Sequence, residues 1–186
     1  MRIISGLLKG KKIDYIRNSK TRPLKDSVKE NIFNILKHSN LIKTKIDNSN
    51  ILDLYCGIGS FGIECISRGA KKVTFIDKDS LALSILEKNI IQLKIKEKSS
   101  TINQKIDDAL KNYLEDKYDV FFFDPPFADN GFIENLKTVK RKKLFNINHV
   151  VIIHRESNKI DNFEKIIKII STKEYGRSKI IFGIFS

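Results

Sequence analysis

Residues 53–62 read Asp53-Leu54-Tyr55-Cys56-Gly57-Ile58-Gly59-Ser60-Phe61-Gly62. The apolar residues 51–55 predict a buried strand, and the residues that follow the glycines, up to Gly69, predict a helix. A strand that passes through a Gly-x-Gly-x-x-Gly turn into a helix opens a βαβ unit, because glycine permits the tight turn that this connection needs. The stretch therefore predicts an α/β fold.

The rest of the chain alternates between apolar strands and amphipathic helices. Further strands are expected at residues 72–77, 100–104, 118–124 and 150–154, and helices at residues 80–93, 109–114 and 161–170, with another helix before residue 150. Such alternation indicates a mostly parallel sheet covered on both faces. Two closing β segments, at residues 172–175 and 179–185, meet at Gly176 and predict an antiparallel edge.

The first 45 residues are far more basic than the remainder. They contain 12 basic and three acidic residues, whereas the whole chain has a net charge of +13. We expect a short strand or hairpin at residues 2–17, an extended segment before Pro23, and a helix whose capping box is Ser27 and Glu30. We therefore divide the chain into a basic N-terminal extension, residues 1–45, and a catalytic domain, residues 46–186.

Charge and composition narrow the class of protein. The chain is 41% hydrophobic and 31% charged, as in a globular protein, and no apolar run is long enough to span a membrane. The positive charge favours a polyanionic partner, and the N-terminal residues expected to face a nucleic acid are Lys9, Lys11, Lys12, Arg22 and Lys25. Cys56 and Cys65 lack metal-ligand spacing, so we expect reduced cysteines, no metal and a cytoplasmic protein.

Three acidic residues are candidate cofactor ligands in addition to the glycine loop, residues 57–62. Asp77 ends the next predicted strand, 20 residues after Gly57, where a carboxylate accepts hydrogen bonds from ribose hydroxyls. Asp53 precedes the glycines, where it repels a pyrophosphate but attracts the ammonium and sulfonium charges of S-adenosylmethionine. Alternatively, Asp53 caps a turn and faces water. Asp108 is the candidate for the adenine amino group, with Asp107 as its neighbour and rival.

A second loop follows the strand at residues 118–124. It reads Asp124-Pro125-Pro126-Phe127. The Asp124 carboxylate and the Pro125 carbonyl are two acceptors for the N–H groups of an exocyclic amine, and the prolines keep them rigid. Phe127 is placed to stack on a base, a contact worth about 1–3 kcal/mol. The loop predicts methyl transfer to an amino group on a base.

Other polar residues are weaker candidates. His149 and His154 flank a predicted buried strand, which favours structural roles. The basic cluster of residues 137–143 is interpreted as a solvated helix face, and Arg177 in the turn after Tyr175 is a minor candidate for an RNA contact.

The motifs together resemble the bacterial 16S rRNA guanine-N2 methyltransferase family (small-subunit methyltransferase D). The resemblance rests on residues 2–6 and 9–12, Thr21-Arg22-Pro23, residues 28–36, residues 53–62, Ser67-Arg68-Gly69-Ala70, residues 124–127 and Tyr175-Gly176. It implies a class I, Rossmann-like methyltransferase fold with a seven-stranded sheet. It also implies S-adenosylmethionine as donor and 16S ribosomal RNA as partner, either free or within the small subunit or its assembly intermediate, with an unstacked guanine as target. We expect the chain to act as a monomer.

The sequence is also compatible with several other functions. The acceptor is alternatively adenine N6 in a nucleic acid or a protein side-chain amide, although a protein amide target usually goes with Asn in place of Asp124. A second alternative is an assembly factor that binds RNA and S-adenosylmethionine but has lost methyltransferase activity, because such a protein would keep the same basic extension. An NAD-dependent oxidoreductase shares the glycine loop but is disfavoured by Asp53 and by the Asp-Pro-Pro sequence.

Overall fold

The computed structural model of the protein describes residues 1–15 and 24–186. Within these residues one seven-stranded sheet has the order β3-β2-β1-β4-β5-β7-β6. The strands are β1 (Asn50–Leu54), β2 (Lys72–Asp77), β3 (Ser99–Asn103), β4 (Tyr118–Phe123), β5 (Phe145–Glu156), β6 (Ile167–Tyr175) and β7 (Ser178–Phe185). Strands β1 to β5 run parallel, and β7 is antiparallel to both β5 and β6. The predicted α/β fold with an antiparallel C-terminal pair is confirmed.

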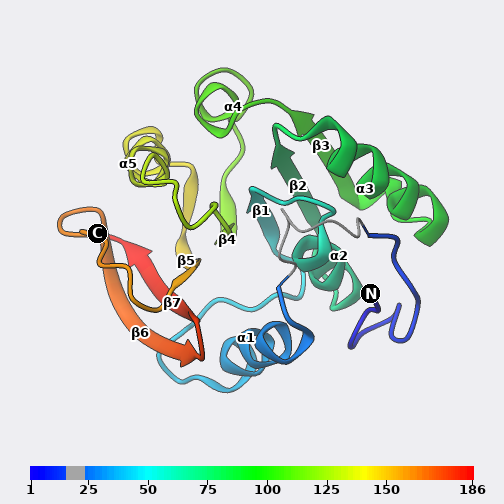
Figure 1. Ribbon diagram of the computed structural model, residues 1–186, viewed down its shortest axis with the longest axis horizontal. Coiled ribbons are helices and arrows are strands. Elements are labelled where there is room, and N and C mark those ends of the chain that lie inside the picture. The colour runs from blue at the N-terminus through cyan, green and yellow to red at the C-terminus, as the bar shows by residue number, and fades with distance from the viewer. Residues whose placement is uncertain (16–23) are drawn as a thin grey trace.

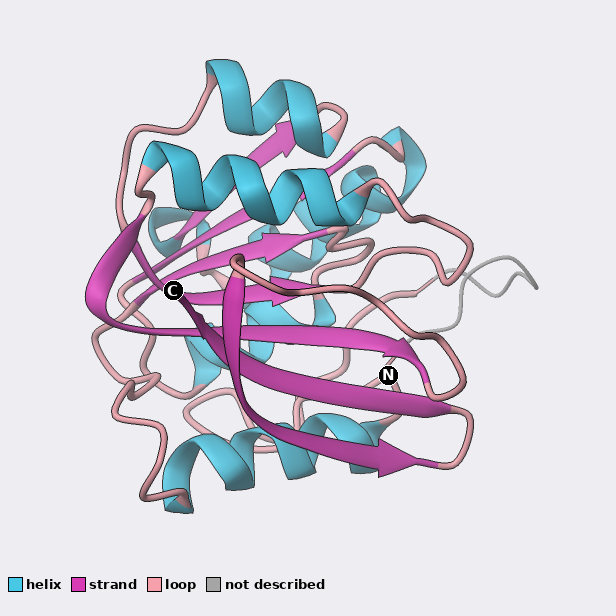
Figure 2. Cartoon of the chain, turned by 90° about the vertical axis from the view of Figure 1, so that its left-hand side faces the viewer, coloured by secondary structure: helices cyan, strands magenta, loops and turns pink. Residues whose placement is uncertain are grey.

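Helices cover both faces of this sheet (Figures 1 and 2). Helices α1 (Asp26–His38), α2 (Ser60–Ser67) and α3 (Ser80–Leu93) pack on one face, and α4 (Ile106–Asn112) and α5 (Phe132–Lys142) pack on the other. Successive residues of a strand point to opposite faces, so Ile51 and Val120 join the first core and Leu52 and Phe121 join the second. This double burial explains why the central strands are continuously apolar.

Residues 2–12 form a hairpin-like turn, the N-terminal turn, which is held against α2 by hydrogen bonds. An antiparallel bridge joins Arg2 to Lys12 and closes the turn. The Glu64 carboxylate of α2 accepts the backbone N–H groups of Ile4 and Ser5, at 2.8 and 2.9 Å. A Cβ at Gly6, whose φ is +83°, would lie 1.9 Å from the Ser67 carbonyl oxygen, so only glycine permits this approach. The described part of the predicted hairpin is thus present as a single-bridge turn, whereas residues 16–17 and the predicted extended segment before Pro23 lie outside the described residues.

Helix α1 connects this N-terminal region to the sheet. The Phe33 ring stacks on Phe61 of α2 at 5.2 Å, and Phe61 in turn stacks on Phe122 of β4 at 4.0 Å. The predicted capping box is wrong, because the helix begins at Asp26 and its N-cap residue, Lys25, makes no side-chain cap hydrogen bond. Ser27 therefore lies inside the first turn, too late in the helix to cap it.

The predicted helix at residues 161–170 is also wrong. The chain forms turns there and then enters β6 at Ile167, which pairs with Phe185 of β7. Phe163, Ile166 and Ile167 are all buried, and their spacing imitates the apolar stripe of a helix. Pairing along β7 outweighs this local pattern, since eight residues of β6 pair with residues of β7. Strands β5 and β6 are accordingly longer than predicted.

Among the residues that the structure describes, no helix is long and apolar enough to cross a membrane.

Candidate active site

Three carboxylates meet at one edge of the sheet. The parallel strands β1, β2 and β4 are in register, so that Leu54 lies beside both Ile76 and Phe123. Asp53, Asp77 and Asp124 therefore occupy the carboxyl ends of three neighbouring strands, where open α/β sheets bind their ligands. Their charges are close enough for Asp124 and Asp77 both to raise the pKa of Asp53.

Gly57 and Gly59 of the loop after β1 and Gly62 in the first turn of α2 differ in their surroundings. A Cβ at Gly57, whose φ is +53°, would meet nothing within 4 Å. At Gly59 it would lie 2.5 Å from Leu86, and at Gly62 it would lie 2.3 Å from the Phe75 ring. Gly57 therefore leaves open space for a ligand to approach the backbone, whereas Gly59 and Gly62 allow the loop and α2 to pack closely on β2 and α3.

Asp53 is buried inside the site. Its side chain is 1% exposed, and its Oδ2 accepts the backbone N–H of Gly62 at 3.0 Å. Burial raises the pKa of Asp53 well above its usual value, and the Gly62 hydrogen bond opposes that rise only in part. The residue does cap the first turn of α2, but it does not face water. A buried carboxylate beside two others favours a cationic ligand.

Asp77 holds the glycine loop in place. Its Oδ2 accepts the N–H of Gly57 at 2.8 Å, and its Oδ1 accepts the N–H of Asp79 at 2.9 Å. Farther along, Asp107 is exposed and pairs with Lys111 at 3.8 Å, whereas Asp108 is half-buried. Asp108 remains our candidate for an adenine contact, because its neighbour is engaged on the outer side of α4.

The loop after β4 is fixed from several directions. The Asp124 backbone N–H donates to the Leu54 carbonyl at 3.3 Å, which ties this loop to the end of β1. Pro125 is buried, Pro126 is exposed and Phe127 is half-buried. The Pro126 carbonyl accepts the N–H of Asp129 at 2.8 Å. The Asp124 side chain remains 26% exposed, so it is both held and accessible.

Two residues of β5 that the sequence did not assign to the site support this loop. His154 Nδ1 lies 2.8 Å from Asp124 Oδ1, and its ring meets the Phe127 ring edge-on with centroids 5.6 Å apart. Arg155 is fully buried, makes two hydrogen bonds to the Asp161 carboxylate at 3.0 and 3.2 Å, and donates to the Pro126 carbonyl at 3.3 Å. The sequence signal that could have identified them is the pair His154-Arg155, which follows the four buried apolar residues 150–153 near the end of a strand.

The structure separates the two histidines that the sequence treated alike. His149 is structural, since its Nδ1 lies 2.7 Å from the Asn146 carbonyl and its Nε2 accepts the Phe185 N–H at 2.9 Å. Burial lowers the pKa of His149, which keeps the ring neutral. The β4–β5 pairing places the His154 ring against Asp124, so this histidine contacts the candidate site whereas His149 does not.

Both cysteines are free, as expected. Burial raises the pKa of the Cys56 and Cys65 thiols well above the usual value, and the Asp53 charge acts in the same direction on both. The thiol beside the glycine loop is therefore protonated at neutral pH, which makes it a poor nucleophile.

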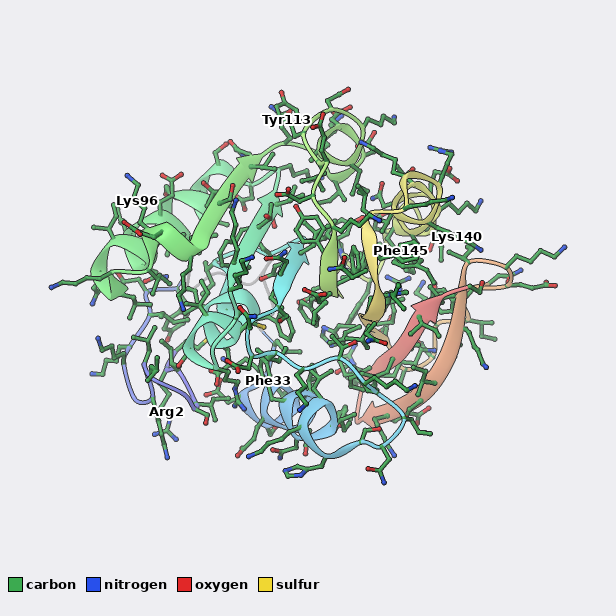
Figure 3. The ribbon with its side chains drawn as sticks, turned by 180° about the vertical axis from the view of Figure 1, so that it is seen from behind. Arg2, Phe33, Lys96, Tyr113, Lys140 and Phe145 are labelled. Atoms are coloured by element: carbon green, nitrogen blue, oxygen red, sulfur yellow. The ribbon has the colours of Figure 1, made fainter. Side chains whose placement is uncertain are left out.

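The two basic regions of the sequence have different surroundings. Lys9, Lys11, Lys12 and Lys25 are exposed and form no ion pair with the described residues, whereas Arg22 lies outside the described part of the chain. In α5, Lys140 donates to the Lys165 carbonyl and Lys142 donates to three carbonyls around the end of α4. Figure 3 places Arg2, which is bridged to Lys12, and Lys140 on opposite sides of the molecule.

Comparisons with known proteins agree with this geometry. The family model described as Conserved hypothetical protein 95 matches residues 1–184. Ribosomal RNA small subunit methyltransferase D of Haemophilus influenzae is 35% identical over 161 residues, which cover 86% of this chain and 80% of the relative.

Two solved structures are also similar over the whole chain. A protein of Haemophilus influenzae described as a methylase, HI0767, has a TM-score of 0.77 and 30% identity, covering 100% of this chain and 98% of its own. The Escherichia coli protein yhhF, described as a methyltransferase, has a TM-score of 0.83 and 23% identity with the same coverage. The sheet order and these neighbours identify the class I S-adenosylmethionine-dependent methyltransferase fold. The chain belongs to the ribosomal RNA small subunit methyltransferase D family of methyltransferases.

Proposed function

We propose that this chain transfers the methyl group of S-adenosylmethionine to the exocyclic N2 amino group of a specific guanine in 16S ribosomal RNA. The observation that carries the proposal is the position of Asp124 at a strand end beside Asp53, with its side chain partly exposed and its Oδ1 fixed by His154. The relatives named as small-subunit ribosomal RNA methyltransferases support the choice of RNA.

The donor site fits a cation rather than a phosphate. Asp53 and Asp77 place two carboxylates beside the glycine loop, and Asp53 is almost fully buried. An anionic pyrophosphate there would meet like charges in a medium of low dielectric constant, at a cost on the order of a few kcal/mol. A bound S-adenosylmethionine supplies a methyl group on a positively charged sulfur. Asp53 would attract its charge, Asp77 would bind the ribose, and Asp108 would bind the adenine.

The acceptor site fits an exocyclic amine. The lone pair of such an amine is delocalised into the base, so the amine is a weak nucleophile until its N–H groups are held. We assign this task to the Asp124 carboxylate and the Pro125 carbonyl, which are kept rigid by the two prolines. Phe127 would stack on the base. Alignment of this kind contributes as much as about 7–11 kcal/mol to a reaction.

The proton balance requires no strong base. The amine nitrogen forms a bond to the methyl carbon while the carbon–sulfur bond breaks, and the nitrogen gains a positive charge. It would then release a proton readily, and the Asp124 carboxylate, which in this proposal holds its N–H, would accept that proton. Before this step the Asp124 carboxylate stabilises the growing positive charge, which is the electrostatic role we assign to it.

The RNA face is the N-terminal turn and the start of α1. Lys9, Lys11, Lys12 and Lys25 are exposed there, and Arg22 belongs to the same stretch of sequence. The turn is held by Glu64 and Ser67 in the second half of α2, and the glycine loop precedes the first turn of that helix. About 10 Å of helix separates the two, a distance that a few nucleotides of bound RNA span.

Transfer of a tritiated methyl group tests the class of acceptor. The protein is incubated with labelled S-adenosylmethionine and, in separate reactions, undermethylated small-subunit ribosomal RNA, DNA and a glutamine-containing peptide. Label in the RNA alone supports the proposal. Label in DNA or peptide would favour the adenine or amide alternatives, and no label in any acceptor would favour an inactive RNA-binding factor.

A further inference from the structure

His154 has an unusual environment for a histidine inside a strand. The residue is 8% exposed, and Nδ1 lies 2.8 Å from Asp124 Oδ1. Its other ring nitrogen, Nε2, is buried and has no hydrogen-bond partner among the described residues. Buried polar atoms are nearly always paired, so a ring that uses only one of its nitrogens requires an explanation.

We propose that His154 is a positioning residue, a neutral imidazole with its proton on Nδ1 that fixes the Asp124 carboxylate and leaves Oδ2 for the acceptor amine. This inference rests on the proposed function, because it assumes that Asp124 binds the amine. It assigns His154 no contact with substrate and no transfer of a proton.

The hydrogen-bonding geometry supports the neutral ring. A carboxylate oxygen is an acceptor, so the nitrogen that faces Asp124 carries a proton. If Nε2 were protonated as well, the protein would bury a charged donor without an acceptor, which costs more than burying the lone pair of a neutral ring. The buried side of the ring therefore favours the form with its only proton on Nδ1.

The charges around Asp124 explain why a donor is useful there. Asp53 faces it from β1, with Asp77 nearby on β2, so the carboxylates at the strand ends repel one another. Arg155, the next residue of β5, is occupied by Asp161 and by the Pro126 carbonyl. Within the described structure, the donor that reaches the Asp124 side chain is the His154 ring, which therefore holds it in one orientation.

His154 also touches the other residue assigned to the base. Its ring meets the Phe127 ring at an interplanar angle of 77° with centroids 5.6 Å apart, an edge-on arrangement that aromatic rings favour. A single side chain thus contacts both the hydrogen-bonding group and the proposed stacking group. Removing its hydrogen bond while keeping its volume separates these two contacts.

The test compares three substitutions of His154. In His154→Asn the side-chain amide nitrogen takes the place of Nδ1, whereas in His154→Gln the amide lies one bond farther from the backbone, and His154→Leu has no donor. We expect kcat to fall roughly 10- to 100-fold in the Leu and Gln variants and to recover to within about threefold of wild type in the Asn variant. The KM for RNA and the Kd for S-adenosylmethionine should change by less than about twofold, since His154 touches neither.

His149 supplies the matched control. It lies in the same strand with the same 8% exposure, but its ring bonds to Asn146 and Phe185, away from Asp124. His149→Gln should lower the melting temperature and leave kcat near wild type. Equal losses of kcat in the Asn and Gln variants of His154, or unchanged kcat in all three, would overturn the inference.

A spectroscopic readout is independent of turnover. The nitrogen-15 shifts of the His154 ring should show a protonated Nδ1 and an unprotonated Nε2 at neutral pH. A proton on Nε2, or on both nitrogens, would contradict the inference even if every variant failed to turn over. If wild-type protein methylates no RNA, the proposed function fails. If wild-type protein is active and the Asn rescue is absent, only the role of His154 fails.

Discussion

Strands β1 and β4 are neighbours, and each brings one decisive carboxylate to the same edge of the sheet, Asp53 within β1 and Asp124 directly after β4. Asp53 is 1% exposed and is bonded to the backbone of Gly62. Asp124 is 26% exposed and is bonded to the side chain of His154. The same residue type on adjacent strands thus has opposite surroundings, and we propose that the inner carboxylate serves the donor and the outer one serves the acceptor.

The largest expected effect is on the acceptor side. Asp124→Ala should lower kcat by roughly a hundredfold to a thousandfold, because it removes the group that orients the amine and stabilises its charge. The Kd for S-adenosylmethionine should stay within about twofold of wild type. Single-turnover kinetics and calorimetric titration measure the two quantities separately.

Glu134→Ala is the control for Asp124→Ala, because it removes an exposed carboxylate of α5 whose ion pair, within the described part of the chain, is with Lys137. It should change neither quantity. If Asp124→Ala weakens cofactor binding as strongly as it slows turnover, the division between the two loops is wrong.

The second effect concerns the donor side. Asp53→Asn keeps an oxygen for the Gly62 N–H but removes the charge. We expect the Kd for S-adenosylmethionine to rise by roughly tenfold or more, since a buried charge attracts a cation strongly. Titration with the cofactor and with its demethylated product tests the cause. The sulfur of the product is an uncharged thioether, so the substitution should weaken binding of the product less than binding of the cofactor. Equal losses for both ligands would show that the charge of Asp53 does not select the sulfonium.

Much of this comparison is predictable from the sequence alone. The glycine loop and the Asp-Pro-Pro loop are local signals, since glycine and proline restrict the backbone wherever they occur. His154 and Arg155 were missed because their roles depend on the pairing of β5 with β4, which no local pattern specifies. The false helix before β6 has the same origin, since pairing with β7 decides its conformation.

The third prediction concerns the surface along which the acceptor RNA approaches the two loops. Changing Lys9, Lys11 and Lys12 together to Gln should weaken RNA binding roughly fivefold at moderate salt. It should also reduce the salt slope of log K by about one for each lost phosphate contact. Filter binding across a series of salt concentrations measures both.

The matched control removes three positive charges from the opposite side of the molecule. Lys137, Arg141 and Lys143 of the α5 region are exposed, and changing them to Gln alters net charge equally. This control should weaken binding much less. Identical salt slopes for the two triple variants would show that total charge, rather than the N-terminal turn, governs RNA binding.

The smallest effect is on stability. Burial raises the pKa of Asp53 above its unfolded value, so the folded protein binds this proton more tightly. The stabilisation that this proton gives the folded protein is fully present below the pKa of Asp53 in the unfolded chain. It is lost as the pH rises through the pKa of Asp53 in the folded protein. Asp53→Asn should therefore raise the melting temperature at neutral pH, by an amount on the order of a few degrees. The difference from wild type should shrink when the pH falls below the ordinary range of a carboxyl group. A variant that melts below wild type at neutral pH would contradict the buried-charge account.

The most direct test of the central claim identifies the methylated nucleoside. Undermethylated small-subunit ribosomal RNA is incubated with S-adenosylmethionine carrying a deuterated methyl group, with either wild-type protein or Asp124→Ala. The RNA is then digested to nucleosides for mass spectrometry. We predict label in N2-methylguanosine with the wild-type protein and almost none with the variant. Label in any other nucleoside, or equal label with both proteins, would contradict transfer to a guanine amino group held by Asp124.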